Sequence, residues 1–130
     1  MKAHIRPSRP CVLAYGMEDT FALSAICQKE GFDLVLASVR DLRTPLGKLC
    51  NLPGSYQKGP EARRTDFLPA LFFSGFGEEQ LDKMLADLKA NSIAVPLKAV
   101  LTASNRIWPL AEVLEELEEE HAAFQKGENA

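Results

Sequence analysis

The chain has 130 residues, enough for one domain with its own hydrophobic core but not for two independent ones. Its hydrophobic fraction of 46% and charged fraction of 25% are those of an ordinary globular protein, and no apolar run is long enough to cross a membrane. The basic N-terminus is not followed by an apolar leader segment, so we expect a single cytoplasmic domain over residues 1–130 with no membrane partner.

The net charge of −3 is unevenly distributed. Residues 1–65 hold ten Lys/Arg and six Asp/Glu, a net +4, whereas residues 66–130 hold five and twelve, a net −7. The densest charged run is the acidic stretch 112–120, while a nucleic-acid-binding protein usually presents a basic face, so no nucleic-acid partner is predicted. The acidic C-terminal helix instead leaves open a homodimer or another protein partner that offers basic side chains.

The three cysteines, Cys11, Cys27 and Cys50, lie far apart and among apolar neighbours. An odd number without metal-ligand spacing predicts small buried residues rather than a disulfide framework or a metal site. No cofactor and no metal are predicted.

In the first half, residues 10–50, the apolar segment 11–15 predicts a buried strand that ends at Gly16. Residues 18–30 predict a helix with Gly31 as its left-handed C-cap, and 32–39 a second strand. Thr44 and Pro45 have the features of an N-cap and a first-turn proline that open a short helix.

Residues 51–66 hold glycines, prolines and polar side chains, which predicts a loop or linker. The second half, residues 67–124, then repeats the order of elements, with strands at 70–75 and 94–102 and helices at 77–91 and 109–124, before a tail at 125–130. The apolar faces expected for the two helices are formed by Leu81, Met84, Leu85 and Leu88, and by Leu110, Val113, Leu114, Leu117, His121 and Phe124.

Both halves read strand, glycine, helix, strand, X-Pro-Leu helix, with "AYG" matching "FSG" and "TPLGKL" matching "WPLAEV", so an internal duplication is predicted. The expected fold is a two-layer α/β sandwich of about four strands, ferredoxin-like βαβ-βαβ, with an added C-terminal helix. The alternative is a truncated receiver-like or flavodoxin-like sheet. A phosphorylated receiver is excluded, because Ser74 or Gly75 stands where the phosphoacceptor aspartate would be.

Polar and aromatic side chains gather where the last strand ends, in "KAVLTASNRIW", residues 98–108. In open α/β sheets, ligands bind beyond the ends of strands, so this stretch is the candidate site of a small binding or regulatory module for a ligand or a protein partner. A purely structural interpretation stays open, in which Asn105 caps the turn and Trp108 fixes the start of the helix. The candidate ligand-binding residues are Gly75, Lys98, Thr102, Asn105, Arg106, Trp108 and His121.

A small enzyme is the alternative function, with Lys98 or His121 as acid or base near Thr102 and Asn105. No nucleophile-base pair accompanies them, and no catalytic residue is assigned.

These motifs taken together resemble an uncharacterised bacterial family, domain-of-unknown-function family 3783. The resemblance lies on Pro45, Leu46 and Gly47, on Gly75 and Phe76, on Lys98–Thr102, Asn105 and Trp108, and on Glu120 and His121. It implies a shared fold and carries no activity with it.

Overall fold

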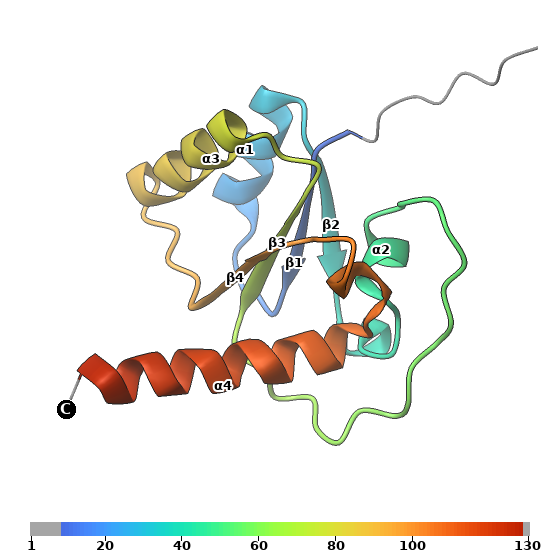
Figure 1. Cartoon of the computed structure of the whole chain (residues 1–130). Helices are drawn as coiled ribbons and strands as arrows, with labels where there is room; N and C mark the ends of the chain where they lie inside the picture. The colour runs from blue at the N-terminus through green and yellow to red at the C-terminus, as the bar shows by residue number, and fades with distance from the viewer. Residues whose placement is uncertain (1–8, 129–130) are drawn as a thin grey trace, which may run out of the picture.

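The computed structural model describes residues 9–128, which form a mixed four-stranded sheet with helices on both faces (Figure 1). Within this part of the chain, no helix combines the length and apolar character needed to cross a bilayer. In chain order the elements are β1 (Cys11–Tyr15), α1 (Phe21–Glu30), β2 (Asp33–Ala37), the 3₁₀ turn η1 (Val39–Asp41), α2 (Leu46–Leu49), β3 (Ala70–Ser74), α3 (Glu78–Ala90), β4 (Leu97–Val100), the 3₁₀ turn η2 (Asn105–Ile107) and α4 (Leu110–Glu128).

The α/β class, the two successive β-α-β units, the four strands and the C-terminal helix are confirmed. The strand order is β2-β1-β3-β4, with parallel pairing inside each half and antiparallel pairing of β1 with β3. The alternative of a truncated doubly wound sheet does not form, because such a sheet would need β1 and β3 to be parallel.

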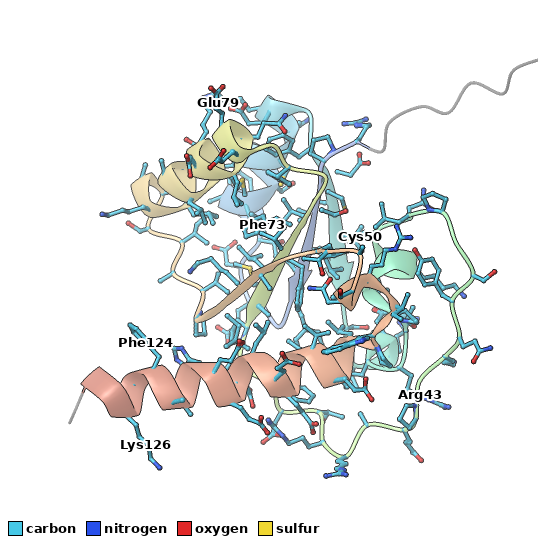
Figure 2. All side chains as sticks on the ribbon, viewed as in Figure 1. Arg43, Cys50, Phe73, Glu79, Phe124 and Lys126 are labelled. Carbon is cyan, nitrogen blue, oxygen red and sulfur yellow. The ribbon has the colours of Figure 1, made fainter. Side chains whose placement is uncertain are left out.

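The sheet is covered on both faces, so the fold has three layers where two were expected. Every residue of the central strands β1 and β3 is buried, and such continuous apolar strands need helices on both sides. Figure 1 shows α1 and α3 together on one face and α4 along the other, with α2 beside it. Phe73 packs under α1 and α3 (Figure 2), while Phe72 faces the core beneath α2 and α4.

The two halves are related by an approximate two-fold axis. Leu13 and Phe72, the middle residues of β1 and β3, face each other in the antiparallel register. Each of these strands ends at a glycine with positive φ, Gly16 at 73° and Gly75 at 77°, a conformation that side chains with a Cβ rarely adopt. The structure therefore repeats its elements in the way the predicted duplication requires.

Residues 51–69, called the strap from here on, join the halves without regular secondary structure. Figure 1 shows the strap passing around α2 and returning beneath α4 to β3. Gly59 fixes its middle, because its N–H donates to the carbonyl of Arg43 (2.8 Å) and its own carbonyl accepts from Nε of Arg43 (2.9 Å).

Helix α4 is longer than predicted, and it continues to Glu128. Residues 125–128 are therefore helical rather than part of a tail. Leu110, Val113 and Leu114 are buried as expected, but Leu117 is only half-buried and Phe124 is 66% exposed. The apolar stripe thus extends past the core, and Phe124 projects from the C-terminal part of the helix (Figure 2).

Candidate functional site

The polar groups of Thr102 and Asn105 bond to each other within their own loop. The N–H of Thr102 donates to Oδ1 of Asn105 (2.8 Å), and the N–H of Asn105 donates to Oγ1 of Thr102 (3.1 Å). This reciprocal pair closes the turn into η2, as a capping box closes the start of a helix. The interpretation of Asn105 as a cap of the turn is confirmed.

Asn105 also covers the end of the exposed edge of β4. Its Nδ2 donates to the carbonyl of Val100 (3.1 Å) while its Oδ1 accepts from Thr102. The side-chain amide bonds to β4 as the main-chain amide of a neighbouring strand would. Beyond this point no further strand can pair without displacing Asn105.

The first half has a similar turn with a different residue. Oδ2 of Asp41 accepts from the N–H of Ser38 (2.8 Å), which closes the turn into η1. A carboxylate has no N–H to donate, so Asp41 cannot cap a strand carbonyl as Asn105 does. The side chain in the turn after β4 therefore caps a strand carbonyl, whereas the side chain in the turn after β2 does not.

Trp108 and Gly75 have structural tasks in this region. The N–H of Trp108 donates to the carbonyl of Asn105 (3.0 Å), and the carbonyl of Trp108 accepts from the N–H of Leu46 (3.1 Å). The indole is 38% exposed. Gly75 leaves β3 at the end where β4 also ends, because the N–H of Leu101 donates to the carbonyl of Phe73 (2.9 Å). Arg106 is half-buried in η2.

Lys98 and His121 lie elsewhere, in a groove between β4 and α4. This α4-side groove has a volume of about 260 Å³. Lys98 and His121 share this groove, and Thr102 and Asn105 are not among the residues that line it. The lining residues are Pro96, Leu97, Lys98, Leu117, Glu120, His121 and Phe124.

A second groove lies on the opposite face of β4, next to α3. This α3-side groove is mostly apolar, has a volume of about 560 Å³, and includes Lys98 in its wall. Sequence reasoning missed it because the helical spacing placed Leu85 in the core, whereas Leu85 is 38% exposed. Nζ of Lys98 donates to the carbonyl of Val95 (2.9 Å). The other lining residues are Leu85, Leu88, Lys89, Ser92, Ile93 and Ala94.

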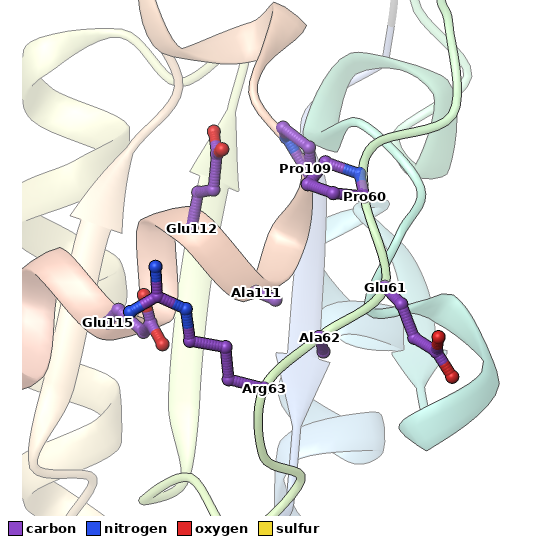
Figure 3. A pocket seen from close by; sticks show the side chains of 8 residues that line it. All are labelled: Pro60, Glu61, Ala62, Arg63, Pro109, Ala111, Glu112 and Glu115. Carbon is purple, nitrogen blue, oxygen red and sulfur yellow. The ribbon is translucent and has the colours of Figure 1, made fainter.

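A smaller pocket of about 170 Å³ lies between the strap and the first two turns of α4 (Figure 3). The guanidinium group of Arg63 extends toward Glu115 along one wall, and Pro60 and Pro109 form the opposite end. The sequence marked residues 51–66 as a linker, but nothing in it indicated that the linker would lie against α4.

At its C-terminal end the strap contacts the acidic helix α4 through a basic side chain. Arg64 donates to Glu118 of α4, and its guanidinium lies 4.2 Å from the ring centroid of Phe67. The second carboxylate oxygen of Glu118 accepts from the N–H of Leu68 (2.7 Å). The hydrogen bond to Glu118 raises the pKa of Arg64 above its usual value.

Fold and site thus define an α/β sandwich built from two similar halves, with an open outer strand that has a groove on each face. Residues 69–124 match the model of the family described as a domain of unknown function (DUF3783), which confirms the resemblance for this part of the chain. The match covers the second half from the end of the strap through most of α4, and Pro45, Leu46 and Gly47 lie outside it. No curated protein and no solved structure matches the chain.

Proposed function

We propose that the protein is a binding module that takes up an extended segment of a protein partner as an added strand along β4. Adding a strand to an open sheet edge is a common form of peptide recognition: main-chain hydrogen bonds supply affinity, and recesses for alternate side chains supply specificity. The observation that carries the proposal is that a groove reaches the start of β4, at Lys98, from the side of α3 and another from the side of α4.

The main-chain groups of β4 support this proposal. The N–H groups of Leu97 and Leu101 donate toward β3, to Pro69 (3.3 Å) and Phe73 (2.9 Å). Because successive residues of a strand alternate in direction, the N–H groups of Lys98 and Val100 point outward. The carbonyl of Lys98 also points outward, and an arriving strand would pair with these groups.

The two grooves define the side chains that the partner should have. Successive residues of an added strand would point alternately into the α3-side groove, which is apolar, and the α4-side groove, which Glu120 borders. Glu116, Glu119 and Glu120 are exposed and form none of the ion pairs found among residues 9–128. We therefore propose a partner segment with apolar residues on one face and a basic residue on the other.

The proposal is tested by panning a phage-displayed library of random peptides on the immobilised full chain and measuring the binding of selected peptides by fluorescence anisotropy. Val100→Pro removes an outward N–H on an edge strand, where proline is tolerated, and should weaken binding about tenfold or more. Leu85→Glu places a charge in the apolar groove and should have a similar effect. Leu36→Glu, on the opposite edge strand β2, is the matched control and should bind normally.

Selected peptides that bind Val100→Pro and wild type equally would overturn the proposal. A wild-type chain that forms dimers in size-exclusion chromatography, with Val100→Pro monomeric, would also overturn it by identifying a second copy of the chain as the occupant of the edge.

A further inference from the structure

The α3-side groove combines an apolar interior with a charged rim. Its walls are α3, the loop that joins α3 to β4, and the start of β4 (Figure 1). Leu88 lines it and is only 3% exposed, so this side chain lies at the bottom, and Leu85 and the half-buried Ile93 also contribute apolar surface. The volume of about 560 Å³ is within the range of about 300–1,000 Å³ found for pockets that bind small molecules.

Among the described residues that line the groove, the polar side chains are two lysines and one serine, with no carboxylate. Lys98 pairs with Leu71 of the core beneath α1 and α3, so its side chain lies on the α3 face of the sheet. Nζ of Lys98 donates to the carbonyl of Val95 (2.9 Å), and an ammonium group has two further hydrogens to donate. Lys89 is exposed in the last turn of α3, and neither lysine forms an ion pair among residues 9–128.

The C-terminal end of α3 does not cancel these positive charges. The main-chain carbonyls of Leu88 and Lys89 accept from the N–H groups of Ile93 (2.9 Å) and Ser92 (3.1 Å). Free carbonyls at the end of a helix carry partial negative charge, and these two are already bonded. An anion at this rim would therefore meet ammonium groups rather than free carbonyls.

We propose that the α3-side groove binds a single-chain anionic amphiphile of the class of a fatty-acid carboxylate. The alkyl chain would lie along Leu85, Leu88 and Ile93. The carboxylate would accept hydrogen bonds from the ammonium groups of Lys89 and Lys98. A purely apolar ligand would leave both charges unused, and a small polar anion would leave the apolar walls in water, so the groove suits a ligand that has both parts.

This inference goes beyond strand addition at β4 and does not depend on it. An added strand would use the outward main-chain groups of β4, whereas the amphiphile uses side chains of the groove. The two occupants would compete, because the apolar side chains of an added strand and the alkyl chain would fill the same space. A bound amphiphile would therefore inhibit peptide binding.

The test is isothermal titration calorimetry of the full chain with decanoate, kept below its micelle concentration and without any peptide. Binding should saturate at one decanoate per chain. Octanoate should bind more weakly, by up to about fourfold for each of the two CH₂ groups that it lacks. Decyltrimethylammonium, which has the same alkyl chain and a cationic head, should not bind.

Variants and an NMR titration locate the site. The double variant Lys89→Gln/Lys98→Gln keeps polar side chains but removes both charges, and it should bind decanoate about tenfold more weakly. Lys48→Gln/Lys58→Gln is the matched control, because it makes the same change in net charge at exposed positions outside the groove, and it should bind as wild type does. In the NMR titration, the main-chain amide signals of Ile93 and Lys98 should shift most.

Equal binding of decanoate and decyltrimethylammonium, an unchanged affinity in Lys89→Gln/Lys98→Gln, or NMR shifts centred away from the groove would each overturn the proposal. Binding to phosphatidylglycerol vesicles without binding of monomeric decanoate would also overturn it, by identifying a membrane surface as the ligand. A chain that binds selected peptides but not decanoate would overturn this inference alone and leave strand addition at β4 intact.

Discussion

Pro45 and Pro109 face each other in an antiparallel bridge that joins the two halves of the chain. On either side of it the hydrogen bonds are reciprocal: the N–H of Leu46 donates to the carbonyl of Trp108 (3.1 Å), and the N–H of Leu110 donates to that of Thr44 (3.0 Å). Each proline precedes the helix that closes its half. The contact thus lies on the approximate two-fold axis, and each half contributes the same groups to it.

Gly59 of the strap packs against one of these prolines, so we predict that Gly59→Ala destabilises the protein. A Cβ at this position would overlap the Pro109 ring, and relieving such a clash costs about 1–3 kcal/mol. Gly127→Ala is the matched control, because nothing lies near its added methyl and alanine favours a helix by up to about 1 kcal/mol over glycine. Urea unfolding measures the free energy of unfolding of both variants and of wild type. A Gly59→Ala variant as stable as wild type would show that the strap is not held at Gly59.

Oδ1 and Nδ2 of the Asn105 side chain should both contribute to the stability of the protein. We expect Asn105→Ala to lose about 1–2 kcal/mol of stability, because it removes the cap of the turn and the bond to Val100. Asn105→Asp should lose less, since a carboxylate still accepts from Thr102, as Asp41 does from Ser38 in the first half. In a hydrogen-exchange measurement, the Thr102 N–H should then exchange slowly in the aspartate variant and fast in the alanine variant.

Ser104→Ala is the control for these variants, because the Ser104 side chain makes no capping bond. If Ser104→Ala lowered stability as much as Asn105→Ala, the loop would be sensitive to any change and the amide would have no special role.

Glu118 should hold the end of the strap against α4. Glu118→Ala removes the acceptor of both Arg64 and the Leu68 N–H, so the strap should be cleaved faster in limited proteolysis and the melting temperature should fall. Glu119→Ala removes an exposed neighbour on the same helix and should leave the cleavage rate unchanged. Equal cleavage of the two variants would mean that other contacts fix the strap.

The burial of Cys27 should lower the stability of the folded protein at alkaline pH. Burial raises its pKa from 9.0 to about 11, so the folded state favours the neutral thiol over the thiolate. This contribution, about 3 kcal/mol, is complete below pH 9, where the unfolded thiol is also protonated, and is lost as pH rises through 11. Urea unfolding from pH 8 to 11 should therefore show a shallower decline for Cys27→Ala than for wild type, and parallel curves would contradict the prediction.

The sequence was sufficient to predict the elements of the fold and their order. Apolar runs that end at Gly16 and Gly75 marked the two central strands, and Gly31 has the left-handed conformation expected of a C-cap (φ 79°). These signals are local in the sequence, so they predict the same elements whatever the order of the strands in the sheet. The repeat of strand, glycine and helix was visible for the same reason.

Strand direction and the second helical layer depend on contacts between the halves, which periodicity does not encode. The absence of alternation in "CVLAY" and "ALFFS" was the one available sign that both faces of the sheet would be covered. The candidate site was predicted only in part for a similar reason. Residue types located a polar loop, but they could not show that Asn105 would bond to β4, or that Lys98 and His121 would lie together in another groove.

The strap has a consequence for how the two halves associate. Two separate chains with the same interface would meet in a bimolecular reaction, and their stability would depend on how concentrated they were. Covalent connection makes the association unimolecular, with an effective concentration that a short flexible linker sets in the millimolar range. The paired halves of this protein therefore remain together at any dilution, and mutations at their interface should change its melting temperature without making that temperature depend on protein concentration.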